Sequence, residues 1–357
     1  ETVGELVKSI ATSLAKLYPD KRALILCIGE KEGEESLEAI KAIFPPENIN
    51  CISFLKKSES IRGKGWSVRA AMEIAQKLKA NLCLFDADLF EVSSEWLRHL
   101  IDAMQEEKMD VVLSEYTASY ANGLISRILL YPLFNTIYRI SIPYPIPKEF
   151  GISYQLLNIY LRDKDIWLTD VGGYGINNWL LSEAIVNEAK ICKVAVGERK
   201  HKLILGKAEL KLREVTKTFF EQIIKNIDWW KMRGKAIQEL PFLGLGYEAE
   251  VKESEVDYRL LISRFRNGFN RYATLYEKLL PMDVYQKLDE LALSTTILKG
   301  DREEFNFPAW LWAEVVYEFI FAFQFRKEFT RGDLLNAFIF LYEGRAASYI
   351  KDIESRR

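Results

Sequence analysis

The sequence predicts an α/β fold with a mixed, mostly parallel sheet and flanking helices, followed by an all-helical C-terminal domain. Short apolar segments alternate with segments of helical apolar spacing through the first half of the 357-residue chain, a pattern typical of a parallel sheet covered by helices. Beyond about residue 216 helical periodicity dominates. A chain of this length is expected to form about two domains, which we place at residues 1–215 and 216–357.

Each element of this prediction has its own apolar pattern. The chain is expected to begin with a helix at 2–17. Strands are expected at 23–28, 51–55, 82–85, 111–114 and 191–196. Helices are expected at 35–43, 67–78, 94–106, 217–231, 255–279, 308–325 and 332–351. Sheets of this class usually open with a strand, so either a first strand lies upstream of Glu1, which we expect, or the fold is altered.

Composition and charge exclude several classes of function. The chain is 49% hydrophobic and 28% charged, with a net charge of −2, which is typical of a soluble globular protein. Basic residues are interspersed with acidic ones, so there is no basic face of the kind that nucleic-acid binding requires. No uncharged segment reaches the roughly 18 residues that span a bilayer. We read the aromatic segment 310–325, which carries Glu314 and Glu318, as a core helix rather than a membrane-surface helix.

The cysteines indicate a reducing compartment. At least Cys27, Cys83 and Cys192 lie in apolar, strand-like segments, without the close spacing of metal knuckles or redox pairs. Reduced, buried thiols and a cytoplasmic location are therefore expected. The sequence leaves open whether the chain forms a homo-oligomer.

A pair of carboxylates marks the first candidate site. Asp86-Ala87-Asp88 directly follows an apolar strand, at the edge where ligands of parallel sheets bind. Alternate residues of an extended segment share a face, so the two carboxylates are expected to point the same way. Such oxygen ligands suit Mg²⁺ or Mn²⁺. The alternative is a pair of solvated turn carboxylates.

A basic, glycine-containing segment lies between a predicted strand and a predicted helix. In Arg62-Gly63-Lys64-Gly65-Trp66, the glycines let the backbone approach a ligand and the helix N-terminus favours an anion. Lys64 adds a point charge and Arg62 a planar fork suited to phosphate. The spacing is not that of a Walker loop. The alternative is a basic turn with glycines at a helix start.

Two further segments carry residues of interest. His201 follows a strand in a charged loop, where a solvated histidine is the alternative interpretation. Residues 170–179 join a loop to a helix and place glycines beside polar groups and aromatic rings. This segment is either a wall of the active site or only a helix N-terminus capped by Asn177.

In their order and spacing these segments resemble the GT-A (Rossmann-like) glycosyltransferases, and most closely the mannosylglycerate synthase and glucosyl-3-phosphoglycerate synthase group. The resemblance runs through nearly the whole chain. It is carried by segments 25–29, 63–65, 85–88, 175–177, 197–201 and 304–312, the last of which contains Glu304-Phe305-Asn306-Phe307 and two tryptophans.

The resemblance implies roles for individual residues. Asp88 and His201 would hold a divalent metal, Mg²⁺ or Mn²⁺, on the diphosphate of a nucleotide sugar, with Asp86 nearer the ribose or the waters of the metal. The Gly63-Lys64-Gly65 segment, with Arg62, would lie along the donor nucleotide. The family transfers its sugar with retention of configuration, and the metal and Lys64 would stabilise the leaving diphosphate.

The chain departs from the family pattern at three places. Asn177 stands where the family often has an acidic residue, and an amide cannot act as a base. Pro147-Lys148-Glu149-Phe150 replaces a segment that often has two glycines, so Glu149 becomes a candidate for the donor-sugar hydroxyls or the reacting face, with Lys148 beside it. Segment 115–120 offers no cation of the kind found in relatives that use small acids.

The function that the sequence predicts is the metal-dependent, retaining transfer of a hexose from GDP-mannose or UDP-glucose to a small polar acceptor. Glycerate or a phosphoglycerate, precursors of compatible solutes, are the acceptors implied by the resemblance. The first alternative is a non-catalytic nucleotide-sugar-binding protein of the same fold, which Asn177 and the upstream strand motivate. A nucleotidyltransferase is the second alternative, although its usual glycine-rich N-terminal loop is not in this sequence.

Overall fold

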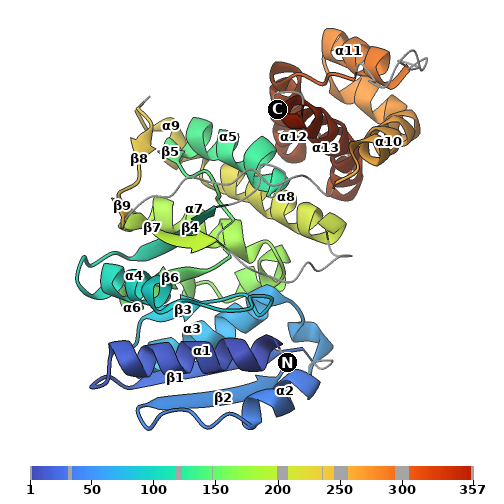
Figure 1. Cartoon of the computed structure of the whole chain (residues 1–357). Coiled ribbons are helices and arrows are strands. Elements are labelled where there is room, and N and C mark those ends of the chain that lie inside the picture. Colours follow the sequence, from blue (N-terminus) through green and yellow to red (C-terminus); the bar gives the residue numbers. More distant parts are fainter. Residues whose placement is uncertain are drawn as a thin grey trace. The chain divides into compact units, whose positions relative to one another are not determined.

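The computed structural model describes residues 2–30, 34–117, 123–146, 148–198, 208–234, 236–244, 256–293 and 305–354. The chain forms two compact units, which are coloured along the sequence in Figure 1. Unit 1 comprises Glu1–Ala118, Leu133–Gln222 and Asn226–Glu250, and unit 2 comprises Ser119–Pro132, Ile223–Lys225 and Val251–Arg357. The domain boundary expected after residue 215 stays a prediction.

Unit 1 begins with a helix and a parallel pair of strands. Helix α1 (Thr2–Leu17) precedes strand β1 (Ala23–Gly29), helix α2 (Glu34–Lys41) and strand β2 (Ile49–Leu55). The strands pair in parallel from Ala23 opposite Ile49 to Gly29 opposite Leu55, and α1 and α2 pack against them (Figure 1). The structure describes β1 as the first strand of the chain, and a strand upstream of Glu1 stays a prediction.

A five-stranded sheet forms the centre of unit 1. Its order is β3 (Leu82–Leu84), β6 (Phe150–Ile152), β4 (Val111–Thr117), β7 (Ile191–Glu198) and β9 (Phe242–Leu243). Strand β6 is antiparallel to both β3 and β4, whereas β4, β7 and β9 are parallel to one another. The predicted mixed, mostly parallel sheet is therefore confirmed.

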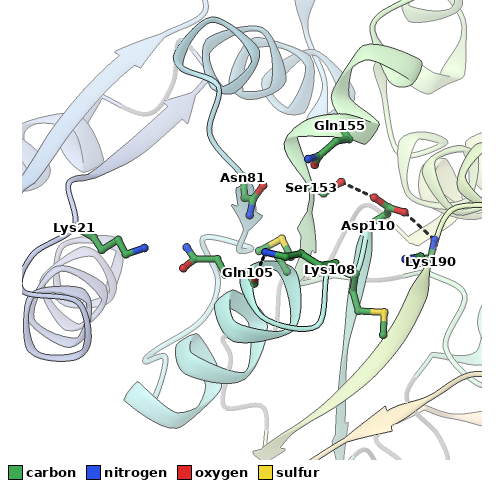
Figure 2. A pocket seen from close by; sticks show the side chains of 10 residues that line it. Lys21, Asn81, Gln105, Lys108, Asp110, Ser153, Gln155 and Lys190 are labelled. Carbon is green, nitrogen blue, oxygen red and sulfur yellow. Dashed lines mark hydrogen bonds between the residues drawn. The ribbon is translucent and has the colours of Figure 1, made fainter.

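This topology separates the two edges of the sheet. Asn81, Asp110 and Lys190 directly precede β3, β4 and β7 and lie together at the amino-terminal edge of these strands (Figure 2). The turn that carries Asp86 and Asp88 follows β3 and thus lies at the opposite, carboxyl-terminal edge.

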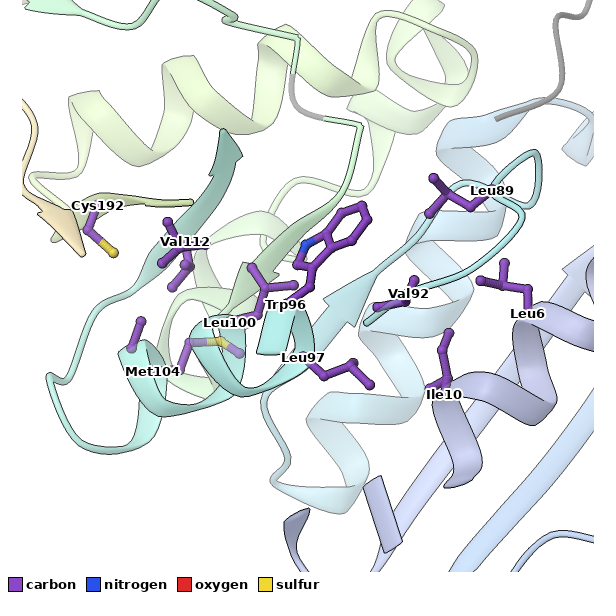
Figure 3. Close-up of a cluster of buried hydrophobic side chains, with 12 residues drawn as sticks. Leu6, Ile10, Leu89, Val92, Trp96, Leu97, Leu100, Met104, Val112 and Cys192 are labelled. Carbon is purple, nitrogen blue, oxygen red and sulfur yellow. The ribbon is translucent and has the colours of Figure 1, made fainter. Parts of the chain in front are cut away.

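A buried apolar cluster binds α1 and α4 to the sheet. Trp96, Leu97 and Leu100 of α4 (Ser94–Gln105) are at most 3% exposed and pack with Leu6 and Ile10 of α1 (Figure 3). Helix α4 begins at Ser93, whose hydroxyl accepts a hydrogen bond from the Trp96 backbone N–H, as an N-cap residue does. The cluster fixes the element that follows the Asp86–Asp88 turn.

The remaining elements of unit 1 surround this core. Further short elements are η2 (Glu59–Ile61), η4 (Phe134–Tyr138), η5 (Asp165–Leu168), η6 (Asp170–Gly172), β5 (Ile140–Ser141) and β8 (Gln238–Glu239). The helices are α3 (Lys64–Leu78), α5 (Tyr131–Leu133), α6 (Tyr154–Tyr160), α7 (Ile176–Val186), α8 (Ala208–Lys225) and α9 (Ile227–Lys231). Residues Phe134 and Phe219 stack at 4.8 Å between ring centroids and join η4 to α8.

Unit 2 is helical. It contains η3 (Ser126–Leu130), α10 (Tyr258–Leu279), α11 (Met282–Leu293), α12 (Ala309–Phe325) and α13 (Arg331–Glu354). Gly268 lets α10 approach α13, because a Cβ at this position would overlap the ring of Phe340. Aromatic rings fill the interior, including Phe265, Phe307 and Phe319.

The expected C-terminal helical region is thus confirmed. The sequence did not predict α11 as a separate helix. Helix α12 is buried along one face, as expected of a core helix, and its Trp310 and Phe325 are more than half exposed. Among the described helices, none combines the length and the apolar character needed to cross a membrane.

Candidate functional site

Three carboxylates converge at the carboxyl-terminal edge of β3. Asp86 and Asp88 lie in the turn after β3, and Glu149 directly precedes β6. Since β6 is antiparallel to β3, with Phe150 opposite Leu84, the start of β6 meets the end of β3. One carboxylate oxygen from each residue lies within 4.8 Å of the others, and the Glu149 side chain is buried. The role predicted for Glu149, at the donor-sugar hydroxyls or the reacting face, stays a prediction; its position beside the two aspartates was not predicted.

Lys64 reaches this cluster from the first residue of α3. Its ammonium group lies 2.6 Å from Asp86 Oδ1, and the two side chains are 24 and 25% exposed. Lys64 therefore places one positive charge against the carboxylate cluster.

The glycines on both sides of Lys64 let α3 pack on backbone. Gly63 has φ +119°, a left-handed conformation that favours glycine. A Cβ at Gly65 would overlap the carbonyl oxygen of Val171, and the Gly65 N–H donates to Gly173 O at 3.1 Å. The start of α3 is thereby fixed against segment 170–175, which the sequence analysis had named as a candidate wall of the site.

A buried ion pair holds the peptide groups of Gly63. Lys56, at the end of β2, is 4% exposed and donates to Glu30 Oε1 at 2.7 Å and to Gly63 O at 2.6 Å. Glu30, after β1, also accepts from the Gly63 N–H at 3.0 Å. We call Glu30 and Lys56 the Gly63 clamp. Neither residue was predicted from the sequence, although Lys56 directly follows one predicted strand and Glu30 lies two residues after another.

The clamp also shifts the ionisation of Glu30. Burial raises the pKa of this carboxyl, but the hydrogen bonds from Lys56 and Gly63 and the nearby positive charges of Lys56 and Arg62 outweigh it. The pKa of Glu30 is therefore lowered from its ordinary value. This places the charge of Arg62, whose side chain is exposed, close to the clamp.

The buried ring of Trp96 contacts two residues that adjoin the carboxylate cluster. Its indole N–H donates to the Ser114 hydroxyl at 3.0 Å, and its ring meets Phe85 edge to face at 5.9 Å. Phe85 directly precedes Asp86, and the Ser114 N–H donates to Glu149 O at 3.3 Å. A single buried ring thus touches the neighbours of two cluster residues.

Helix α8 fixes the segment that faces α3. Glu214 accepts from the Tyr174 N–H at 2.7 Å, and Lys217 lies 2.9 Å from Asp170 Oδ2. Burial raises the pKa of Glu214, and the hydrogen bond from Tyr174 opposes that shift only in part. The pKa of the Tyr174 hydroxyl is raised as well, first by burial and then by the charge of Glu214.

The other predicted site residues are placed as follows. Lys148 is half-buried next to Glu149. Asn177 lies in the first turn of α7, is 2% exposed, and its Oδ1 has no hydrogen-bond partner among the described residues. It does not cap α7, because the N-cap residue is Gly175. His201 lies outside the described residues, so its role as a metal ligand stays a prediction.

No family model matches the sequence, and no curated protein does. Solved structures with a similar fold do match. Glucosyl-3-phosphoglycerate synthase of M. tuberculosis is 18% identical with a TM-score of 0.44, over 62% of this chain and 77% of that one. The same enzyme in complex with Mn²⁺, UDP-glucose and phosphoglyceric acid is 16% identical with a TM-score of 0.42, over 60% and 82%.

Mannosyl-3-phosphoglycerate synthase of Rubrobacter xylanophilus is also similar. It is 13% identical with a TM-score of 0.40, over 63% of this chain and 80% of that one. These are the same groups of glycosyltransferases that the sequence resembles. At these TM-scores the likeness does not carry the functional argument, which rests on the geometry of the site.

Proposed function

We propose that this chain is a metal-dependent, retaining glycosyltransferase that moves a hexose from a nucleotide sugar to a small polar acceptor. The observation that carries the proposal is the convergence of Asp86, Asp88 and Glu149, whose carboxylate oxygens lie within 4.8 Å, beside the ammonium of Lys64. A cation site next to a fixed basic segment at a helix start suits a diphosphate.

The donor set fits a hard divalent cation. Carboxylate oxygens are the ligands that Mg²⁺ and Mn²⁺ prefer, with water and phosphate oxygens completing the shell. Three carboxylates this close repel one another, so a divalent cation would stabilise their charged forms. When bound, such a metal supplies Lewis-acid stabilisation to a leaving diphosphate. Asp86, Asp88 and Glu149 would hold it, with His201 as a further ligand on the strength of the family resemblance.

Lys64 has a second role in this proposal. Its ammonium now lies against Asp86, and a cation bound to Asp86 would compete for the same oxygen. Lys64 would then be free to contact a phosphate oxygen of the donor, with Gly63 and Gly65 allowing the backbone to approach. The Gly63 clamp keeps Lys64 in this place, and Arg62 adds positive charge at the rim.

The choice of donor and acceptor follows the resemblance. GDP-mannose and UDP-glucose are the proposed donors, and glycerate and 3-phosphoglycerate the proposed acceptors. Segment 115–120 carries no cation of the kind found in relatives that use small acids, which weakens glycerate and phosphoglycerate as acceptors.

The metal site is tested by calorimetric titration with MnCl₂ and MgCl₂. Wild-type protein is expected to bind either cation, and Asp88→Asn to bind at least about tenfold more weakly, because a charged ligand becomes a neutral one. Glu47→Gln, which removes an exposed carboxylate after Pro46, is the matched control and should bind as wild type does. Equal affinity in all three proteins would refute the assignment.

Turnover is tested separately with each donor and acceptor pair in the presence of Mn²⁺. Release of GDP or UDP together with a glycosylated acceptor is expected, and both should stop in EDTA. Tight donor binding without any product would instead support the non-catalytic nucleotide-sugar-binding protein. The buried amide of Asn177 favours that alternative, since an acidic residue is common there in the family.

A further inference from the structure

A pocket with several polar lining residues lies at the edge of the sheet opposite the carboxylate cluster. Its volume is about 540 Å³, and it opens between the residues that precede β3, β4 and β7 (Figure 2). Small-molecule pockets commonly fall in this size range, at about 300–1,000 Å³. All of its lining residues belong to unit 1. It is therefore separate from the proposed donor site, with β3 running between the two edges.

Positive charge dominates the lining. Lys21, Lys108 and Lys190 contribute three ammonium groups from three different parts of the chain. Asp110 is the one acidic residue in the lining of this described pocket. Its carboxylate already accepts two hydrogen bonds, from the Ser153 hydroxyl at 2.9 Å and the Lys190 backbone N–H at 3.0 Å (Figure 2). The Asp110 carboxylate is thus already hydrogen-bonded within the protein. The lysine side chains remain the charged groups that a ligand would meet.

Three of the six neutral residues in the lining carry side-chain amides. Asn81 Oδ1 accepts from the Tyr154 N–H at 2.9 Å, so the amide nitrogen is the part of Asn81 that is left to donate. Gln105 and Gln155 contribute two more amides, and the backbone carbonyl oxygen of Gln105 accepts a hydrogen bond from the Lys108 ammonium. Lys108, three residues after the end of α4, has a left-handed backbone with φ +55°. The amide N–H groups of the lining thus add donors to those of the lysines, as a site for an anion requires.

We propose that this pocket binds a small anion with at least two acidic groups, and that it is a second ligand site independent of the donor site. Three ammonium groups spread around one cavity match two or more separated anionic groups better than a single one. The shared chemistry is that of phosphate and carboxylate oxygens, both of which accept charge-assisted hydrogen bonds from lysine and amide donors. The proposal does not depend on the proposed transferase activity.

Calorimetric titration with pyrophosphate and with citrate tests the site and separates the two ligand chemistries. The full chain would carry Lys64→Met and be kept in EDTA, so that pyrophosphate cannot bind at the carboxylate cluster. Saturable binding of one probe or both is expected, weakening as salt is added because exposed charges are screened. The probe that binds more tightly identifies the acidic group that the pocket prefers.

A matched pair of triple variants assigns the binding to this pocket. Lys21→Gln, Lys108→Gln and Lys190→Gln together should weaken binding by about tenfold or more, since three exposed charge contacts of modest strength are lost. Lys57→Gln, Lys231→Gln and Lys327→Gln change the net charge equally at exposed positions elsewhere and should bind as the parent does. Thermal melts without probe check that both variants fold. Absent binding, or equal weakening in the two triples, would overturn the proposal.

Discussion

Replacing Lys56 by methionine removes a buried ammonium while keeping a side chain of similar length. In the wild-type chain this ammonium makes two short hydrogen bonds, to Glu30 at 2.7 Å and to Gly63 O at 2.6 Å. The variant leaves the carboxylate of Glu30 with the Gly63 N–H as its remaining partner in the clamp, and it leaves the carbonyl of Gly63 without the ammonium. Both lost hydrogen bonds help to hold Gly63, the residue that precedes Lys64.

The size of the effect follows from the burial of the two partners. Removing one member of a fully buried ion pair destabilises a protein by about 3–5 kcal/mol. Lys56 is 4% exposed but Glu30 is 35% exposed, so water solvates part of the remaining charge and screens the pair. We therefore expect the free energy of unfolding to fall by about 2–3 kcal/mol. Donor binding should weaken as well, because the Gly63 clamp no longer holds the start of α3.

Urea unfolding followed by circular dichroism measures the loss. Lys57→Met is the control, since Lys57 is the next residue and its side chain is exposed; surface substitutions of this kind usually change stability by less than about 0.5 kcal/mol. If Lys56→Met and Lys57→Met unfold at the same urea concentration with the same slope, the clamp does not stabilise the fold as argued.

The same pair predicts a dependence on pH. The pKa of Glu30 is lowered in the folded chain, so its contribution to stability is present above the pKa of an unfolded glutamate, about 4.3. That contribution is lost as the pH falls through the lower folded value. The stability difference between wild type and Lys56→Met should be full at pH 7 and shrink below about pH 4. A difference that grows on acidification would refute this reading of the ion pair.

Three further substitutions test the packing around the site and in unit 2 by their unfolding midpoints. Gly65→Ala should abolish donor binding and lower stability, because the new methyl would overlap the carbonyl of Val171; unchanged binding would contradict the close backbone contact. Trp96→Phe should lower stability by about 2 kcal/mol, because the buried hydroxyl of Ser114 loses the indole N–H that donates to it. The same variant should weaken Mn²⁺ binding if the indole ring helps to position the carboxylates. Gly268→Ala gains about 1 kcal/mol of helix propensity but overlaps the ring of Phe340, so a net loss is expected and a net gain would show that α10 and α13 can shift apart.

Local patterns were enough to predict most elements of the fold. Helix α1 was predicted with the bounds that it has, and β1, β2 and β3 within two residues of theirs, because apolar periodicity is a local property of the chain. The order of strands is not local. Strand β6 is only three residues long, too short to show a period, and its insertion between β3 and β4 could not be foreseen.

The candidate site shows the same limit. Asp86 belongs to one short sequence motif, and Lys64 with its two neighbouring glycines forms another. The structure brings Lys64 and Asp86 together. Glu30 and Lys56 belong to no short motif. Only the pairing of β1 with β2 places them side by side. Glu149 was singled out, but its position beside Asp86 and Asp88 was not predicted, because nothing in the sequence shows that β6 is antiparallel.

The position of η3 in unit 2 has a consequence for synthesis. The indole N–H of Trp312 donates to Ile128 O at 2.7 Å, across 184 residues of chain. At a synthesis rate of about 5–20 residues per second, the helical turn around Ile128 leaves the ribosome roughly 10–40 seconds before this partner exists. During that interval the apolar side chains of Ile128, Leu129 and Leu130, buried in the finished protein, lack the helices that later cover them. This segment is therefore where a nascent chain is expected to need protection by a chaperone.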